Sequence, residues 1–307
     1  MTGRIIRQFE TGYQRTLITA DTEGNHLWRR FPGRNRTSPL HGPSPAVSRV
    51  LTGLSHGQVH AVLANEESDG GVSYTVPGSV SVAGLALSTP TGSDLDRLAT
   101  LLTATGGLLR RIQSAGPAAT TAAVPSGPAR ALAWMRNGSG PRATAPLHEE
   151  LRRSLGAKRW DEAMHWCHEF TSPAPDDSLL HGAASMGQIV LAPQPDAAAL
   201  LVGEDVARGP ADFDAGWLLG ELLELHVLAA AQSFRREFLG VARAAFLDGL
   251  GRLDDPARTG RAAILRLLVH AHDFAAYVGW HPELLVHARV LPALVDTGGN
   301  GILTDPW

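Results

Sequence analysis

The chain has 307 residues, 44% of them hydrophobic, with 27 basic and 30 acidic side chains. A chain of this length buries a substantial core in one large or two smaller domains, and its nearly balanced charge excludes a strong field for nucleic acid or a membrane surface. The single cysteine, Cys167, excludes an internal disulfide and a multi-cysteine metal site. No apolar run is long enough to span a bilayer, so we expect a cytoplasmic protein. Because Lys158 is the only lysine among many alanines, glycines and arginines, we expect a bacterial source.

The first 90 residues are predicted to be rich in β-strands. Strands are predicted at residues 13–20, 26–31, 59–63 and 72–76. The first two flank an Asp-Thr-Glu-Gly turn, with Gly24 at a position that favours positive φ. The last two are predicted to pair with each other across a polar tip. A short helix is predicted at residues 46–54, between these two pairs of strands.

The remaining residues, 91–307, predict mainly helices. The segment 94–112 has apolar residues at helical spacing, although Gly106 and Gly107 weaken the prediction. Further helices are predicted at residues 128–136, 145–155, 160–170, 213–231, 231–250, 256–278 and 282–294. Their tryptophans are expected in the core rather than on a surface that stacks bases.

The middle of this region carries the most informative pattern. Two short apolar runs, 189–191 and 198–202, flank a turn at 193–196 and predict a central hairpin within residues 188–202. A His-Gly pair at positions 181 and 182 precedes the hairpin. The sequence Glu-Asp-Val-Ala-Arg-Gly at 204–209 follows it, and Asp214 stands near the start of the next predicted helix.

This order of motifs resembles the catalytic segment of the aminoglycoside phosphotransferase family, a branch of the protein-kinase-like fold. In that family a His-Gly-Asp loop ending in Asn precedes a hairpin, and the second strand of the hairpin ends in a metal-binding Asp. The resemblance implies an α+β, bilobal protein-kinase-like fold, with a β-rich N-lobe at residues 1–90 and a mainly helical C-lobe at residues 91–307. It also implies ATP or GTP with Mg²⁺ as cofactors.

The residues that carry the family's chemistry are different in this chain. Its catalytic Asp falls on Ala183, its metal-binding Asn on Gln188 and its strand-end Asp on Val202. Phosphoryl transfer needs a positioned nucleophile and Mg²⁺ held by oxygen ligands, and alanine and valine supply neither. We therefore assign no catalytic residue to the degenerate loop of His181, Ala183 and Gln188.

Four other residues are candidates for ligand contacts. Arg29 and Arg30 stand on the strand where the family has a phosphate-binding cation, and strand alternation places one on each face; the alternative is that both are solvated. Glu204 and Asp205 lie just past the missing metal-binding Asp and offer displaced carboxylates for Mg²⁺. Solvated loop acids are the alternative for that pair.

Three residues are expected to have structural roles. His181 either orients the degenerate loop, as its family counterpart does, or is a buried histidine with satisfied hydrogen bonds. Asp214 either caps a helix or orients the loop through backbone N–H groups. Arg208 matches the family segment after the hairpin and is also assigned a structural role.

Two pairs of histidines are close enough in sequence to be considered as metal ligands. His165 and His168 share a face of a predicted helix and stand beside Cys167, but Cys167 points off that face and no fourth ligand is evident. His270 and His272 are two residues apart on a predicted helix, so they point to different sides. We predict no metal site at either pair.

Two functions from different classes are compatible with these residues. The first is a pseudokinase, a binding protein that holds a peptide, a nucleotide or a partner enzyme. The second is an atypical ATP- or GTP-dependent kinase that acts on Ser or Thr hydroxyls of a peptide, or on a small molecule; the sequence resembles the degenerate phosphotransferases of ribosomal peptide (lanthipeptide or thioamitide-like) natural-product biosynthesis. A relic without a ligand is a third interpretation. We favour the pseudokinase because losing the base and both metal ligands together is hard to compensate.

Overall fold

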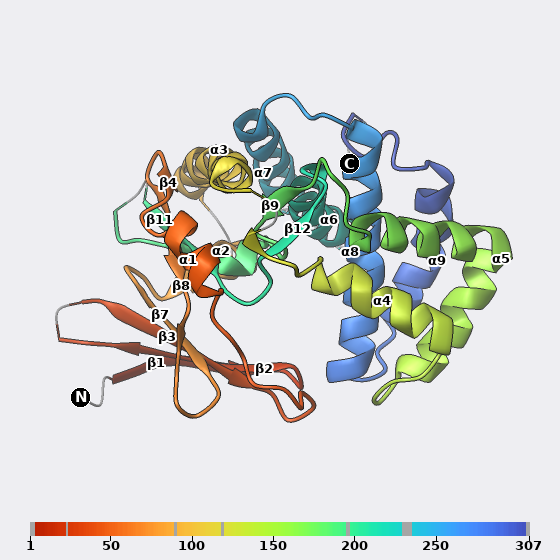
Figure 1. Ribbon diagram of the computed structural model, residues 1–307, viewed down its shortest axis with the longest axis horizontal. Helices are drawn as coiled ribbons and strands as arrows, with labels where there is room; N and C mark the ends of the chain where they lie inside the picture. Colours follow the sequence, from red (N-terminus) through yellow and green to blue (C-terminus); the bar gives the residue numbers. More distant parts are fainter. Residues whose placement is uncertain are drawn as a thin grey trace.

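The computed structural model describes residues 4–22, 24–88, 91–117, 120–194, 197–228 and 235–304. Strands gather at one end of the molecule and helices at the other, as Figure 1 shows. The predicted α+β organisation, with a β-rich N-terminal part and a helical C-terminal part, is therefore confirmed. Within the described ranges, no helix combines the length and the apolar character needed to cross a membrane.

The N-lobe is built on a five-stranded sheet with the order β1-β2-β3-β7-β6. Its strands are β1 (Arg4–Glu10), β2 (Gln14–Ala20), β3 (His26–Pro32), β6 (Asn65–Glu66) and β7 (Val72–Val76), all paired antiparallel. Ile18, Trp28 and Tyr74 lie on its inner face and form a small core with the strands behind it. The predicted strands in this sheet are confirmed. The pattern does not predict β1, because nearly all the side chains of this edge strand are exposed and show no alternation.

A second five-stranded sheet joins the two lobes, with the order β4-β5-β11-β10-β8. Its strands are β4 (Ser55–His56), β5 (Val59–Leu63), β8 (Val80–Ser81), β10 (Ile189–Leu191) and β11 (Ala198–Val202). The central hairpin is confirmed, since β10 and β11 pair antiparallel. The predicted pairing of 59–63 with 72–76 is wrong, because β5 instead lies parallel to the fully buried β11. The chain then continues as β6, which takes the place beside β7.

The C-lobe is formed by helices that pack on one another around a large apolar core. The helices of this lobe are α3 (Gly92–Ser114), α4 (Ser126–Asn137), α5 (Thr144–Thr171), α6 (Asp212–Leu228), α7 (Arg235–Leu250), α8 (Pro256–Tyr277) and α9 (Leu284–Asp296). The shorter helices α1 (Pro45–Leu51) and α2 (Val82–Ala86) belong to the N-lobe side. The short strands β9 (Ser178–Leu180) and β12 (Ala207–Gly209) pair antiparallel beside the hairpin.

Most predicted helices are confirmed. The predicted helices 145–155 and 160–170 form the two parts of α5, which are separated at Gly156, where φ of 68° and ψ of 170° are not helical. One instructive difference concerns Gly106. Gly106 does not disrupt α3, because it lies where α3 meets α7. A Cβ at this position would come within 2.7 Å of the Leu250 backbone nitrogen, so the glycine permits close packing. The predicted end of one helix at 229–231 and the start of the next lie outside the described residues.

Candidate functional site

The two lobes enclose a cavity of about 530 Å³. Its walls come from β1, β2, β3 and β7 on one side, and from Ser185, Gly187, Gln188 and residues 203–205 on the other. A second hollow of about 460 Å³ adjoins it and shares Tyr13, Glu204 and Asp205 with it. Cavities of this size between lobes are the common location of ligand sites, so the cleft is the candidate site.

The loop that begins at His181 is held by buried hydrogen bonds. The carboxylate of Asp214, at the start of α6, accepts the backbone N–H groups of His181 at 2.7 Å and Gly182 at 2.8 Å. The Nε2 of the His181 ring lies 3.0 Å from the Leu201 carbonyl oxygen. Gly182 has φ of +83°, and a Cβ there would lie 1.7 Å from the Asp205 carbonyl oxygen. The conformation of this loop is therefore fixed by its own backbone and by Asp214.

Burial decides the ionisation behaviour of Asp214. Removing this carboxyl group from water raises its pKa above the usual range, while His181 and the two backbone N–H groups act in the opposite direction. Its two oxygens are already committed to the loop. Asp214 therefore positions the loop and does not reach the cavity.

The three positions that differ from the family pattern provide no acidic group to the cavity. Ala183 carries only a methyl group at the base of the loop. Val202 is fully buried in the C-lobe core at the end of β11. Gln188 lines the cavity, and its buried Oε1 has no hydrogen-bond partner among the residues that the structure describes. One neutral oxygen is thus the only donor atom that these positions offer to a metal.

Glu204 and Asp205 both line the cavity, but their carboxylates are already bonded. Glu204 forms a bidentate ion pair with Arg36, with N–O distances of 2.7 and 2.8 Å, and also accepts the His41 backbone N–H at 3.3 Å. Asp205 accepts the Ser126 hydroxyl at 2.8 Å. An arginine guanidinium only donates hydrogen bonds and stays protonated, so it competes directly with a cation for Glu204.

These carboxylates belong to a polar bridge between the lobes, which we call the interlobe cluster: Tyr13, Arg36, Arg130, Glu204, Asp205 and Asp273. Arg36 donates to the Tyr13 hydroxyl at 2.6 Å, and Arg130 pairs with Asp273 at 2.8 Å. Burial and the nearby Asp205 carboxylate raise the pKa of Tyr13 to about 12, so Tyr13 remains a neutral phenol. The Tyr13 ring also contacts Tyr277 of α8, with 4.9 Å between the ring centroids. The cluster therefore fastens the N-lobe to the C-lobe.

The two neighbouring arginines of β3 lie on opposite faces of the sheet. Arg30 lines the cavity with its guanidinium 5.2 Å from the centre of the Tyr74 ring, and its buried Nε has no partner within the described residues. Arg29 instead faces Asp69, with an N–O distance of 3.1 Å, and it remains partly exposed. Arg30 is thus the arginine of this pair that a ligand in the cavity can reach.

Sequence reasoning missed the aromatic wall of the cavity. Trp28 and Tyr74 line it and are almost fully buried. The Trp28 indole N–H donates to the Gly78 carbonyl oxygen at 2.8 Å, in the segment that leads from the N-lobe into the C-lobe. The signal was present in the sequence, because strand alternation places Trp28 on the same face as Arg30.

The remaining residues singled out from the sequence lie away from the cavity. Arg208 donates to Asp177 at 3.0 Å and to the Ala174 carbonyl at 2.9 Å, so it holds the segment before β9. His165 and His168 are exposed on α5. His272 contacts the adjacent Asp273, whereas His270 contacts Glu224. The contact of His270 with Glu224 belongs to a group completed by His287. The sequence did not predict this group, because its members lie on three helices.

Comparisons with known proteins identify the fold. No protein-family model matches the sequence, and no curated protein matches it either. The structure is similar to an amicoumacin kinase solved with AMP-PNP, Ca²⁺ and Ami, with 15% identity, 98% of this chain and 90% of that chain covered, and a TM-score of 0.58. It is also similar to a microcompartment-associated aminopropanol kinase, with 15% identity, coverage of 98% and 93%, and a TM-score of 0.53. A third similar structure is a GDP complex of an aminoglycoside 2′-phosphotransferase, with 14% identity, 99% of this chain and 95% of that chain covered, and a TM-score of 0.52.

The fold is that of the aminoglycoside phosphotransferases and related kinases. At these identities the likeness shows the phosphotransferase fold alone, and the chemistry has to be argued from the residues present. Those residues do not fit a magnesium nucleotide. Glu204 is neutralised by Arg36, and the strand-end position is the buried Val202. A hard cation that needs several oxygen ligands finds no set of free carboxylates in the described part of the cleft.

Proposed function

We propose that this chain is a pseudokinase, a degenerate member of the aminoglycoside phosphotransferase family that binds a ligand in the interlobe cavity without transferring phosphate. One observation carries the proposal. The loop keeps its shape through Asp214, yet Ala183, Gln188 and Val202 replace every acidic or metal-binding position around it. Phosphoryl transfer depends on electrostatic stabilisation by metal ions and on a positioned acceptor, and neither is supplied.

The interlobe cluster supports the same conclusion. Glu204 and Asp205 are the two acids nearest the missing metal position, and both serve as hydrogen-bond acceptors for the protein itself. Placing Mg²⁺ on Glu204 would break its pair with Arg36 and leave that guanidinium beside a divalent cation. The resulting repulsion opposes metal binding.

The cavity favours a peptide as its ligand. Arg30 lines the cavity beside the Tyr74 ring, and Arg7 stands exposed on its wall. Phe9 and Leu87 also line it and are large apolar side chains with 52% and 66% of their surface exposed. Cations and apolar groups in one open cleft complement a peptide that carries acidic and apolar side chains. A partner enzyme that acts on such a peptide, as in ribosomal peptide natural-product biosynthesis in bacteria, is the setting we propose.

The Trp28 side chain weakens the case for a nucleotide. Backbone carbonyl and N–H groups in a cleft commonly orient a bound base. Here the Gly78 carbonyl already accepts the Trp28 indole N–H, and Trp28 occupies space at the inner wall of the cavity. A base that used the Gly78 carbonyl would have to replace the Trp28 indole N–H in this hydrogen bond.

An atypical ATP- or GTP-dependent kinase is the second candidate. The observation that favours it is that Asp205 lines the same cavity as Arg30, so one carboxylate and one cation face a common space. Unlike Glu204, Asp205 is bonded to a neutral hydroxyl rather than to an arginine. This candidate requires Mg²⁺-dependent nucleotide binding that involves Asp205.

The unfolding temperature in the presence of ligands tests both functions, because a ligand of the native state stabilises it by mass action. We expect no Mg²⁺-dependent shift with ATP or GTP. We expect a shift with a synthetic peptide of Glu and Leu residues, and Arg30→Ala should weaken peptide binding by about tenfold through loss of a charge-assisted hydrogen bond. Arg29→Ala is the matched control, since it removes the neighbouring arginine from the opposite face.

The same assay separates the outcomes. A Mg²⁺-dependent shift with ATP that disappears in Asp205→Asn, together with phosphate transfer to a Ser- or Thr-containing peptide, would replace the pseudokinase by the atypical kinase. Equal effects of Arg29→Ala and Arg30→Ala on peptide binding would reject the cavity as the binding site.

A further inference from the structure

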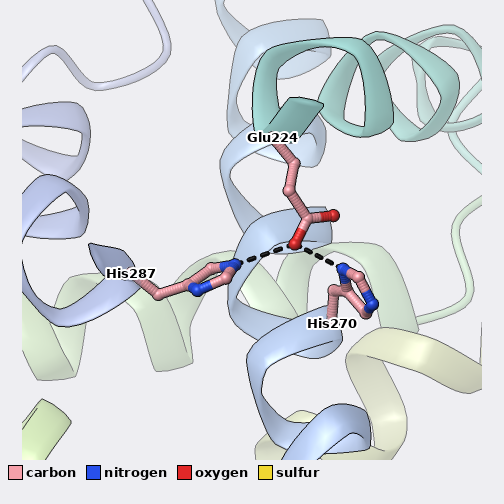
Figure 2. Close-up of side chains that lie close together, drawn as sticks. All are labelled: Glu224, His270 and His287. Atoms are coloured by element: carbon pink, nitrogen blue, oxygen red, sulfur yellow. Dashed lines mark hydrogen bonds and ion pairs between the residues drawn. The ribbon is translucent and has the colours of Figure 1, made fainter. Parts of the chain in front are cut away.

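A second cluster of chemically capable side chains lies in the helical lobe. Glu224 near the end of α6, His270 in α8 and His287 in α9 converge on one point, as Figure 2 shows. Glu224 Oε1 lies 2.8 Å from His287 Nε2 and also contacts His270 Nδ1. One potential ligand atom from each residue lies within 4.8 Å of the other two. None of these residues lines the interlobe cavity.

The surroundings of the three side chains are those of a protected site with one open side. Glu224 and His287 have 4% and 6% of their side-chain surface exposed, whereas His270 has 41%. Two of the groups are therefore removed from water, and the third connects them to solvent. An ion can enter along His270, and a water molecule can complete its coordination from the same side.

The hydrogen bond of His287 Nδ1 decides whether Nε2, the ring nitrogen that faces Glu224, carries a proton. Nδ1 of His287 lies 3.2 Å from the carbonyl oxygen of Glu283, one turn earlier in the chain. A carbonyl oxygen only accepts hydrogen bonds, so Nδ1 carries the proton in this contact. In the neutral ring Nε2 then presents its lone pair to the Glu224 carboxylate. Two acceptors at 2.8 Å require a cation between them, either a second proton on the ring or a metal ion.

We propose that Glu224, His270 and His287 bind a divalent transition-metal ion of the zinc type. Two imidazole nitrogens and one carboxylate oxygen form a ligand set that zinc accepts, with water as the fourth ligand. Ligand atoms around tetrahedral zinc lie roughly 3.4 Å apart, so the contacts of Glu224 with the two histidines must lengthen when an ion binds. The N–H of His287 Nδ1 that donates to a backbone carbonyl is the support that metal-bound histidines usually have.

The site would join three helices that are distant in sequence. Glu224, His270 and His287 stand on α6, α8 and α9, so one bound ion would cross-link the outer part of the C-lobe. Because binding requires the folded arrangement, zinc would stabilise the native state. This role is independent of the interlobe cavity and of any ligand held there.

Zinc binding by the whole protein tests the proposal. After removal of metals with a chelator, we expect one equivalent of Zn²⁺ to remain with the protein through gel filtration and to raise its unfolding temperature. His270→Ala should weaken Zn²⁺ binding by at least about 100-fold, since even loss of a supporting group costs about 10–100-fold. Co²⁺ should give visible absorption bands of a four-coordinate site in the wild type and lose them in this variant.

A control variant and a check of folding make the experiment decisive. His165→Ala combined with His168→Ala removes two exposed histidines from α5 and should leave Zn²⁺ binding unchanged. His270→Ala is preferred to a change at His287, because its exposed side chain contributes less to folding, and circular dichroism verifies that the variant is folded. Wild-type protein that retains no zinc, or the same zinc affinity in wild type and His270→Ala, would overturn the proposal and leave a proton between Glu224 and His287.

Discussion

The interlobe cluster and the Glu224–His270–His287 group both place carboxylates close to nitrogen donors, yet they have different chemical capacities. In the cleft, Glu204 faces Arg36 and Asp205 faces a serine hydroxyl. In the helical lobe, Glu224 faces two imidazoles. An arginine can only satisfy a carboxylate, because it has no lone pair to offer a metal. An imidazole that loses its proton becomes a ligand beside the same carboxylate.

The comparison shows that carboxylates alone do not indicate a metal site. The sequence places Glu204 and Asp205 near the position where the family holds its metal, and the tertiary structure gives Glu204 an arginine. It also brings together three residues of the C-lobe that the sequence does not connect. The nitrogen type beside each carboxylate, rather than the number of acids, separates a structural ion pair from a candidate metal site.

The largest loss of stability is expected from Arg36→Ala. Its side chain is 9% exposed and carries the bidentate pair with Glu204, so the change leaves a half-buried carboxylate without its counter-charge. We expect the free energy of unfolding to fall by about 2–4 kcal/mol, measured by urea denaturation. If the variant acquired Mg²⁺-dependent stabilisation by ATP, Glu204 would be able to serve as a metal ligand. The distinction between the interlobe cluster and the Glu224 group would then be wrong.

A matched control is available within the same lobe. Arg29 also forms an ion pair, with Asp69, but both partners are substantially exposed. Arg29→Ala should change the free energy of unfolding by no more than about 0.5 kcal/mol. Equal losses for both variants would show that the Arg36–Glu204 pair has no special role in joining the lobes.

A smaller effect is expected from Glu224→Gln in metal-free buffer. The glutamine retains a carbonyl oxygen for His270 and His287 but removes the charge, so charge-assisted hydrogen bonds become neutral ones. The free energy of unfolding should fall by about 1–2 kcal/mol, measured with a chelator present. Glu149→Gln on the exposed surface of α5 is the control and should have no measurable effect. A stability equal to wild type would mean that Glu224 and the two histidines do not interact in the metal-free protein.

The most specific effect is a dependence of stability on pH at Asp273, three residues after His270 on α8. Burial acts to raise the pKa of this carboxyl, but the charge of Arg130 and a hydrogen bond from His272 lower it to about 2, from 3.8. A lowered pKa means that the ionised form stabilises the native state above pH 3.8, and that this stabilisation is lost as the pH falls toward 2.

Asp273→Asn should therefore lower the free energy of unfolding by about 1–2 kcal/mol near pH 6. The difference from wild type should shrink as the pH falls from about 4 to 2, measured by urea denaturation across that range. A difference that stays constant down to about pH 2 would show that packing, rather than the charge of Arg130, accounts for the effect.

The fold was largely predictable from the sequence, because its signals are local. Apolar periodicity identified the helices, and the hairpin of β10 and β11 followed from two short apolar runs around a turn. The partner of β5 was not predictable in this way. Residues 59–63 are compatible with either sheet, and the choice depends on the buried β11 more than 130 positions later in the chain. Local patterns specify a strand but not its neighbour.

The candidate site shows the same division at the level of single residues. Strand alternation alone placed Arg29 and Arg30 on opposite faces, and the residues at 183, 188 and 202 follow directly from aligning the His-Gly motif with the hairpin. By itself, the sequence thus determined the fold class and the absence of the usual acidic groups. Only the tertiary structure decided that Arg36 binds Glu204 and that Glu224, His270 and His287 meet. The physical reason is that charge pairing and metal coordination act over a few ångströms in space, between residues 46 to 168 positions apart in the chain.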